Sequence, residues 1–284
     1  MSEITVKHFY QIPTYIEQDL YSFLSTAFLE NIPSLMEEAT NGIHFLLYKK
    51  DILIGYLFVD LLDLEEISFV GAIHPDYRNQ GFFKYLLSFG YKYLKKYVPL
   101  KKSSYFSSFV SYDNKYAIDI LKHLGGKTVC SEYFLTYNCE KKMFPSNISL
   151  EITTDLEQLS IIHSSIFNQY KEDSFEQLSN FVDGKFYYIY NHSILVGMVH
   201  LQPFGSYTYL SAFGILPYYQ NKGLGKASLD ATTSTFGNIK LQVSSLNKNA
   251  YSFYMNYGFS IKSRYDYITF KRKTLETIKQ VSNK

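Results

Sequence analysis

The sequence predicts an α/β (α+β) protein with two consecutive domains of the same fold. Residues 73–84 and 215–226 share Ile, Pro, Tyr, Asn, Gly and Lys at a constant offset of 142 positions, and residues 110–117 and 243–250 match at an offset of 133. The offset changes at the additional connection 97–102 of the first copy. Constant offsets on both sides of one length change indicate an internal duplication rather than accidental similarity.

The length of the chain supports the same division. Its 284 residues suffice for two domains of roughly 100–200 residues each. The polar segment 140–147, which contains Pro145, is the expected linker. We therefore expect domains at 1–140 and 146–284.

The first copy shows helical and strand periodicities in a definite order. Apolar Ile16, Leu20 and Leu24 predict one face of its first helix, and Asn41-Gly42 predicts a turn. The expected strands are 4–9, 43–48, 52–60, 65–73, 105–110 and 128–137, and the expected helices are 13–29, 33–40, 79–97 and 114–125.

The second copy repeats this plan. Its expected strands are 148–152, 185–190, 194–202, 207–216, 239–243 and 259–270, and its expected helices are 155–167, 175–181, 221–235 and 247–257. The polar tail from residue 271 is expected to be partly helical or frayed.

Composition excludes several classes of function. A net charge of +2 gives no case for a nucleic-acid partner. The start of the chain lacks a basic segment followed by an apolar one, and no run approaches ~18 apolar residues, so we expect a cytoplasmic protein without a membrane partner. Cys130 and Cys139 have no neighbouring metal-ligand residues, so neither a metal nor a disulfide is implied.

The most informative motif is Gln220-x-x-Gly223-x-Gly225, between an expected strand and an expected helix. Glycines at this spacing allow backbone N–H groups to converge, and the positive end of the helix dipole adds to them. Such a nest binds an anion such as a phosphate group. Lys222 and Lys226 add positive charge nearby.

A second motif follows at residues 247–259, with the pattern Asn-x-x-Ala-x-x-Phe-Tyr-x-x-x-Gly-Phe. Together the two motifs and the order of elements resemble the GNAT superfamily of acyl-CoA-dependent N-acyltransferases. The resemblance covers 148–270 well and 4–137 more weakly, so the chain is identified as a tandem member. It implies that each domain is a mixed, mostly antiparallel sheet flanked by helices, with a splayed cleft for acyl-CoA.

The resemblance also assigns residues to the cosubstrate acetyl-CoA. The turn would hold the pyrophosphate of coenzyme A, and backbone groups near Phe213 and Ile215 would face the thioester, with Gly214 marking a bulge in the strand. Asn247 is expected to cap a helix and is a candidate coenzyme contact. The residues implied in coenzyme binding are Phe213, Gly214, Ile215, Gln220, Asn221, Lys222, Gly223, Leu224, Gly225, Lys226 and Asn247.

Tyr254 falls where the family places the general acid that protonates the departing thiolate. The alternative reading is one more aromatic residue in a tyrosine-rich helix. The base that deprotonates the amine is not evident from the sequence. His200 and, less strongly, His163 are candidates, and ordered water is another.

The first copy departs from the motifs at two positions. Phe83 stands at the position of Gly225, and Leu121 at that of Tyr254, whereas Arg78-x-x-Gly81 is intact. Because leucine donates no proton, we expect a first domain that has lost the chemistry. It would act as a packing partner, a wall of the substrate cleft or a coenzyme-bound regulator.

The predicted function is transfer of an acetyl group from acetyl-CoA to a primary amine by the second domain. The amine belongs to a small molecule or a peptide, and the protein is a monomer or a homodimer. The alternatives are a non-catalytic acyl-CoA-binding or interaction protein and a Fem-type aminoacyl-tRNA-dependent transferase, also a tandem of this fold. Near-neutral charge and the intact turn count against the latter.

Overall fold

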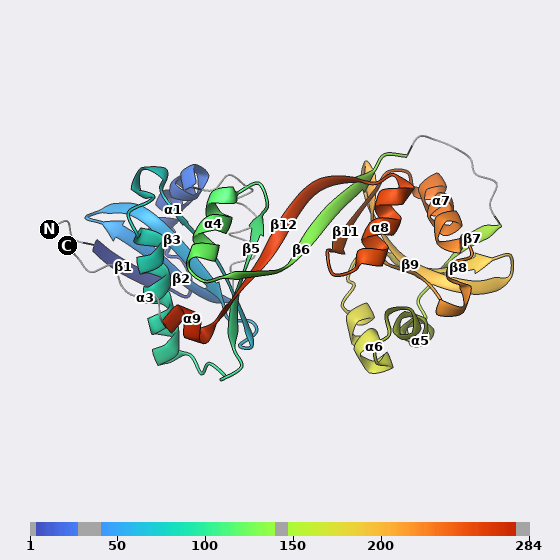
Figure 1. The fold of residues 1–284 in the computed structure, drawn as a ribbon, viewed down its shortest axis with the longest axis horizontal. Helices are drawn as coiled ribbons and strands as arrows, with labels where there is room; N and C mark the ends of the chain where they lie inside the picture. Colours follow the sequence, from blue (N-terminus) through green and yellow to red (C-terminus); the bar gives the residue numbers. More distant parts are fainter. Residues whose placement is uncertain (1–3, 28–40, 140–146, 277–284) are drawn as a thin grey trace. The chain divides into compact units, whose positions relative to one another are not determined.

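A computed structural model describes residues 4–27, 41–139 and 147–276. The chain forms two compact units, one of residues 1–131 with 265–284 and one of residues 132–264. Figure 1 shows the ribbon coloured along the chain. Each unit is a mixed α/β structure with a mostly antiparallel sheet between helices, as the sequence predicts.

The sheet of the first unit follows the order β1-β2-β3-β4-β5-β12. Neighbouring strands are antiparallel except β4 and β5, which are parallel. The strands are β1 (Ile4–Phe9), β2 (Gly42–Lys49), β3 (Ile52–Asp60), β4 (Glu66–Ile73), β5 (Tyr105–Ser111) and β12 (Ser260–Lys271). The helices are α1 (Thr14–Ala27), α3 (Phe82–Tyr97), α4 (Lys115–His123) and α9 (Arg272–Glu276).

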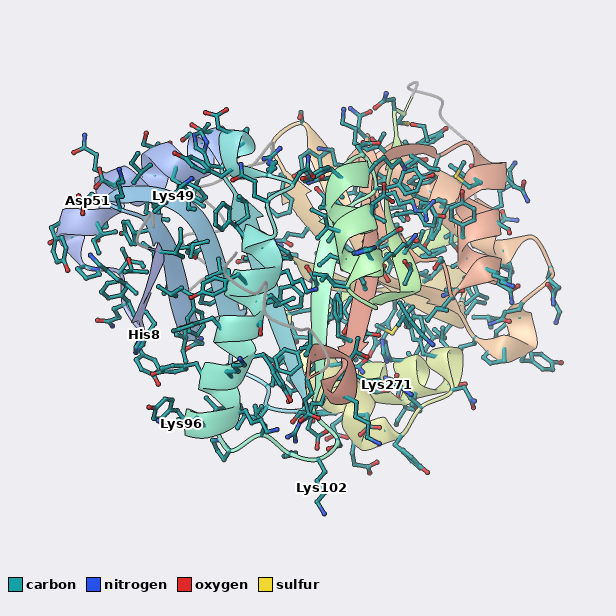
Figure 2. The ribbon with its side chains drawn as sticks, turned by 60° about the vertical axis from the view of Figure 1, so that its left-hand side comes forward. His8, Lys49, Asp51, Lys96, Lys102 and Lys271 are labelled. Carbon is teal, nitrogen blue, oxygen red and sulfur yellow. The ribbon has the colours of Figure 1, made fainter. Side chains whose placement is uncertain are left out.

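Two apolar clusters cover the two faces of this sheet. Helix α1 packs on one face through residues such as Leu20 and Leu24, and helices α3, α4 and α9 pack on the other through Leu86, Leu121 and Leu275. Charged side chains such as Lys102 point away from the ribbon (Figure 2). The apolar periodicity of the sequence thus selects the buried face of each helix.

The second unit repeats the arrangement in the order β6-β11-β10-β9-β8-β7, again with one parallel pair, β10 and β11. Its strands are β6 (Lys127–Tyr137), β7 (Ile148–Thr153), β8 (Lys185–Asn191), β9 (Ile194–Phe204), β10 (Tyr207–Ile215) and β11 (Ile239–Ser244). Its helices are α5 (Leu156–Phe167), α6 (Lys171–Ser179), α7 (Leu224–Phe236) and α8 (Lys248–Tyr257). Helices α5 and α6 cover one face and α7 and α8 the other (Figure 1).

The last strand of each copy pairs in the other unit. Residues 132–137 of β6 pair with β11, and residues 265–271 of β12 pair with β5. The division at 1–140 and 146–284 follows the duplicated sequence and stays a prediction. The compact units have other bounds because of these two pairings.

Three expected helices have wrong limits. Helices α3 and α7 begin at Phe82 and Leu224 instead of 79 and 221, because Asn79 and Asn221, and the glycines two residues later, have positive φ angles that a right-handed helix excludes. Helix α6 spans 171–179 instead of 175–181, with acidic residues in its first turn that favour an earlier start. The expected helix 33–40 lies outside the described residues.

Candidate active site

The Gln220–Gly225 turn links β10 to α7 in the second unit. Pro217–Tyr219 forms a single helical turn, after which Asn221 and Gly223 adopt left-handed φ angles of 59° and 78°. The Gln220 side-chain Nε2 donates a 2.8 Å hydrogen bond to the carbonyl oxygen of Ile215, which ties the turn to the end of β10. The N–H groups of the first turn of α7 have no partners within the helix, so they are available to an anion.

The backbone of this turn is open to a ligand. A Cβ atom on Gly223 would meet nothing within 4 Å, and one on Gly225 would only touch the Phe253 ring at 3.5 Å. Lys226 is exposed, and the Lys222 ammonium lies 4.5 Å from the centre of the Tyr218 ring. The residues present therefore fit a diphosphate: converging donors, close access to the main chain and nearby positive charge.

Strands β10 and β11 separate beside the turn. Their parallel pairing is confined to Thr208 with Ile239 and Tyr209 with Lys240. Beyond these pairs β10 continues to Ile215 and pairs only with β9, so that among the described residues its edge toward β11 has no partner strand. The free edge of β10 can accept an extended ligand such as a pantetheine arm.

A β-bulge interrupts β10 on its β9 side, in the stretch whose other edge is free. The pairing with β9 shifts between Ser211 and Gly214, which leaves Ala212 and Phe213 outside the regular ladder, and Ala212 has a φ of 47°. A bulge redirects backbone groups and bends the strand. The neighbouring Gly214 has a packing role, because a Cβ there would lie 2.3 Å from Ile166 Cγ2 of α5.

Phe253 joins the three parts of the site. Its ring stacks with Phe213 of the bulge at a centroid distance of 6.2 Å and faces Gly225 of the turn. Tyr254 is the next residue on α8, and its ring packs between Phe253 and Phe259 at 5.3 Å from each. The fold therefore brings the bulge, the turn and this tyrosine into one neighbourhood.

Tyr254 is buried, with 7% of its surface exposed. Burial raises the pKa of its phenol well above the ordinary value of 10. The ring is held by apolar contacts in the core of the unit, and its hydroxyl forms no hydrogen bond with any residue that the structure describes. At neutral pH the hydroxyl carries its proton.

Asn247 caps α8, as expected. Its Oδ1 accepts a 3.1 Å hydrogen bond from the backbone N–H of Ala250. This leaves the amide NH₂ group as the part that could reach a coenzyme.

The two candidate histidines are buried and hydrogen-bonded. His200 Nε2 donates to the carbonyl oxygen of Asp183, and Nδ1 accepts from the Ser211 hydroxyl, both at 2.9 Å. His163 is buried beside the Ser174 hydroxyl, 3.1 Å from Nδ1. Burial lowers the pKa of both imidazoles, and the occupied nitrogens of His200 leave no lone pair for an incoming amine.

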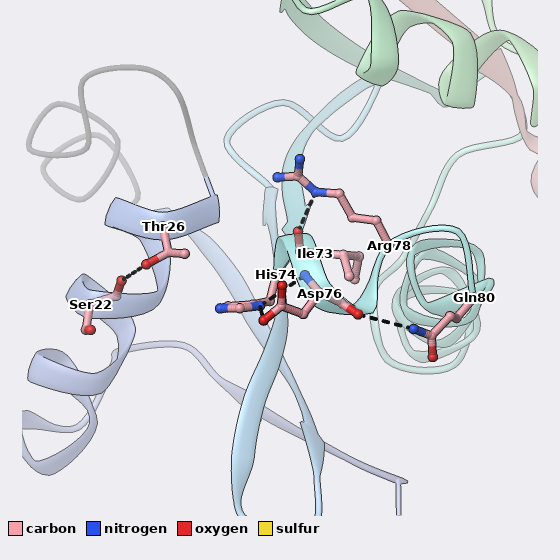
Figure 3. Close-up of polar contacts among 7 residues, drawn as sticks. All are labelled: Ser22, Thr26, Ile73, His74, Asp76, Arg78 and Gln80. Atoms are coloured by element: carbon pink, nitrogen blue, oxygen red, sulfur yellow. Dashed lines mark hydrogen bonds and ion pairs between the residues drawn. The ribbon is translucent and has the colours of Figure 1, made fainter.

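The first unit contains the same turn. Pro75–Tyr77 forms the helical turn, and Asn79 and Gly81 have φ angles of 61° and 82°. Figure 3 shows Arg78 in the place of Gln220, with Nε donating a 3.0 Å hydrogen bond to the carbonyl oxygen of Ile73. The backbone conformation is therefore preserved although the side chain differs.

The two units differ at the bulge of β10 and at the position of Tyr254. The pairing of β4 with β3 runs through Phe69–Ile73 without a register shift, so the first unit lacks the bulge of β10. Leu121, the counterpart of Tyr254, is buried and offers no proton.

Sequence reasoning missed two contributors to the site. Ala212 carries the positive φ of the bulge, and a non-glycine residue in a strand gives little signal of such a conformation. Phe253 connects the turn to the bulge, and its place in the motif, directly before Tyr254, could have indicated this.

Two absences concern only the described part of the chain. Within it, no group of three or more His, Cys, Asp or Glu side chains could hold a metal ion. Within the same residues, no helix combines the length and apolar character needed to cross a membrane.

The turn, the bulge and the parted strands lie together in the second unit. Residues 155–259 match the family model "Acetyltransferase (GNAT) family". The chain contains a GNAT acetyltransferase domain in its second half, and its fold is that of a tandem GNAT protein. Among curated proteins, none matches the chain.

Solved structures of similar fold cover nearly the whole chain. A GCN5-related N-acetyltransferase from Sphaerobacter thermophilus is 12% identical, with a TM-score of 0.69 over 95% of this chain and 96% of the other. A tandem GNAT protein from the clavulanic acid biosynthesis pathway, solved without AcCoA, is 10% identical, with a TM-score of 0.63 over 95% and 99%. A GNAT-family acetyltransferase from Colwellia psychrerythraea is 14% identical, with a TM-score of 0.57 over 94% and 100%.

Proposed function

We propose that the protein is an N-acetyltransferase that uses acetyl-CoA, and that the second unit catalyses transfer to a primary amine. The observation that carries this proposal is the bulge at Ala212–Phe213, on the free edge of β10 and beside the turn. A family of this kind uses an acyl thioester and an amine. The bulge and Tyr254, both of which adjoin Phe253, offer groups for the carbonyl oxygen and the sulfur of the thioester.

Binding is assigned to the turn and the free strand edge. The N–H groups of 221–225, with Lys226, hold the diphosphate, and the edge of β10 pairs with the amide groups of the pantetheine arm. Gly223 and Gly225 permit close approach because they have no side chain. Acetyl-CoA supplies the acetyl group as a thioester.

Backbone N–H groups at the bulge stabilise the negative charge that develops on the carbonyl oxygen as the amine attacks. One such donor is typically worth ~3 kcal/mol of barrier. The amine nitrogen forms the new C–N bond to the carbonyl carbon, and collapse of the resulting tetrahedral intermediate breaks the C–S bond. Tyr254 gives its hydroxyl proton to the departing sulfur. The proton lost by the amine passes to water, and a proton from water restores the phenol.

The acceptor is assigned only by class, as the primary amine of a small molecule or a peptide. Because both nitrogens of His200 are occupied, water in the cleft is the proposed carrier of the amine proton.

The experiment is a turnover assay with acetyl-CoA and a panel of primary amines, detecting the free thiol. Release of coenzyme A that requires an amine and is lost in Lys226→Glu supports the proposal. Lys226 is exposed at the third position of α7, where a glutamate suits the helix dipole, so the variant should fold normally. Amine-dependent turnover that survives this charge reversal with unchanged KM for acetyl-CoA would contradict the assignment to the second unit.

A further inference from the structure

Helices α5 and α6 of the second unit carry large apolar side chains on their outer side. The inner side is buried against the sheet through residues such as Leu159 and Leu178. Six apolar residues of the same segment are exposed, among them Tyr170 at 78% and Val182 at 94%. The six are Ile161, Phe167, Tyr170, Phe175, Phe181 and Val182. Exposed apolar side chains gathered in one segment are typical of an interaction surface, and we call these residues the α5–α6 surface.

The α5–α6 surface is surrounded by negative charge. Residues 151–185 contain seven acidic and two basic side chains, although the whole chain has a net charge of +2. One of the basic side chains, Lys171, is bound to Glu157 at 2.5 Å. Four further carboxylates are exposed without an ion-pair partner among the described residues: Glu172, Asp173, Glu176 and Asp183.

The opposite face of the second unit has the opposite charge. The turn and helices α7 and α8 carry Lys222, Lys226 and Lys248, whereas their one acidic residue, Asp230, accepts a 2.8 Å hydrogen bond from the Tyr257 hydroxyl. The basic face is the one that fits a diphosphate. The acidic face fits a cation by the same argument of charge complementarity.

The α5–α6 surface adjoins the bulge of β10. The ring of Phe181 lies 4.4 Å from that of His200, and His200 is hydrogen-bonded to Ser211, where the register of β10 shifts. At the other end of the bulge, a Cβ on Gly214 would lie 2.3 Å from Ile166 of α5. The end of α5 and the residues that follow α6 are therefore both connected to the strand that would hold the thioester carbonyl.

We infer that the α5–α6 surface docks the acceptor, and that this acceptor is a basic peptide whose primary amine reaches the thioester at the bulge. The inference rests on the acetyl transfer proposed for the second unit, in which the turn and Tyr254 occupy the α7–α8 side and leave the α5–α6 side to the amine.

The chemistry of the surface selects this class of acceptor. Carboxylates attract lysine and arginine side chains, and exposed aromatic rings bind the same cations over their faces. The rings also cover the apolar stems that these side chains carry. The exposed residues extend from Ile161 to Val182 over two helices, so an extended peptide can contact several of them at once, whereas a small amine can contact few.

The test is titration calorimetry of the full chain with three peptides of equal length. Each has a free N-terminal amine and one lysine, surrounded by four arginines, four glutamines or four glutamates. At 0.1 M salt the arginine peptide should bind at least about tenfold more tightly than the glutamine peptide, and the glutamate peptide should bind the most weakly. At 1 M salt the screening length falls from about 10 Å to about 3 Å, so this preference should shrink to about threefold or less.

Two matched double variants locate the effect. Glu176→Gln with Asp183→Asn removes two charges from the surface and keeps the shapes of the side chains. It should reduce the preference for the arginine peptide to about threefold or less. Glu17→Gln with Asp51→Asn removes the same net charge at exposed positions of the first unit and should keep the preference within about twofold of wild type.

A third variant tests the aromatic part of the surface. Tyr170 is the N-cap of α6, and serine is a favoured residue at that position, so Tyr170→Ser should leave the helix stable. Because an exposed ring is lost, the arginine peptide should bind about threefold or more weakly. An unchanged affinity would remove the aromatic rings from the docking surface.

Thiol release from acetyl-CoA with the same peptides separates the two proposals. The values of kcat/KM should follow the order of the affinities, with the difference in KM. Equal affinities of the arginine and glutamine peptides, or a preference that survives Glu176→Gln with Asp183→Asn, overturn the docking surface and leave the proposed function intact. Preferential binding of the arginine peptide without amine-dependent thiol release overturns the proposed function and leaves a binding surface for basic peptides.

Discussion

Replacement of Tyr254 by phenylalanine tests the general acid most directly. The change removes the hydroxyl and keeps the ring contacts with Phe253 and Phe259 at 5.3 Å. Because the hydroxyl has no hydrogen-bond partner among the described residues, the free energy of unfolding should change by less than about 1 kcal/mol. Any larger effect on turnover then reports on the reaction.

The size of that effect follows from the two pKa values. General acids contribute about 10²–10⁴-fold to rate. A phenol with a pKa of at least 10 is a weaker acid than a thiol with a pKa of about 8.5, so full proton transfer to a free thiolate is uphill by at least about 2 kcal/mol. Burial raises the pKa of Tyr254 further, so we expect kcat to fall by about 10²-fold, at the low end of the range.

The pH dependence gives a second check. Because burial raises the pKa of Tyr254, the folded enzyme keeps the phenol protonated through pH 10. The wild-type kcat should therefore show no alkaline loss from this group below pH 10. An alkaline limb near pH 8–9 that disappears in Tyr254→Phe would contradict the cause assigned to the shift.

The assay is thiol release with acetyl-CoA saturating, under conditions where the rate does not depend on solvent viscosity and chemistry is limiting. Tyr251→Phe is the matched control, because it removes a hydroxyl from the same helix at a residue whose ring contacts Tyr133. It should retain kcat within about twofold, as expected for a group outside the reaction. Full kcat in Tyr254→Phe, with chemistry limiting, would refute its role as the acid.

Three further predictions concern the first unit. Burial raises the pKa of Tyr56, so its contribution to the free energy of unfolding is fully present below pH 10 and falls above pH 10 by about 1.4 kcal/mol per pH unit. Between pH 9 and pH 11 the urea midpoint should therefore fall less in Tyr56→Phe than in wild type. Equal falls in the two proteins would contradict this assignment. Phe83→Gly should lower stability by about 2–4 kcal/mol, and adding Gly71→Phe should restore part of it, because a Cβ on Gly71 would lie 3.0 Å from Phe83 Cε2; a double-mutant cycle with no coupling would argue against this contact. Leu275→Ala should lower the free energy of unfolding by about 2–5 kcal/mol, because Leu275 is 2% exposed in the core of the first unit. Amide hydrogen exchange should rise in the first unit, and a rise confined to residues 132–264 would contradict the assignment of α9 to that unit.

The turn was predictable from sequence because its chemistry is local. Asn at residue 221 and Gly at residue 223 are residues that adopt left-handed angles readily, so the spacing alone fixes the conformation. The two expected helix starts, at 79 and 221, were wrong because both positions lie inside this turn, whose positive φ angles a right-handed helix excludes.

The pairing of the last strands was not predictable, because it depends on contacts far apart in the chain. Strands β6 and β12 occupy the same position in the two copies, and periodicity along a strand does not identify its partner. A bulge was expected at Gly214 and the pairing shifts between Ser211 and Gly214, but the part played by Ala212 was not predicted, because this residue owes its positive φ to the strands around it and not to its own preference.

Comparison of the two units separates binding from reaction. Both units have the same turn conformation, a pair of parted strands and one aromatic ring between the strand and the helix. The ring belongs to Phe83 in the first unit and to Phe213 in the second. Among the described residues, β10 has a bulge where its counterpart β4 has none, and Tyr254 stands where the first unit has Leu121. In the function that we propose, a diphosphate needs only the first set, and a thioester carbonyl with its leaving sulfur needs the second. We therefore do not take Phe83 in the place of Gly225 as a sign of lost binding. The register of one strand is the better sign of lost chemistry.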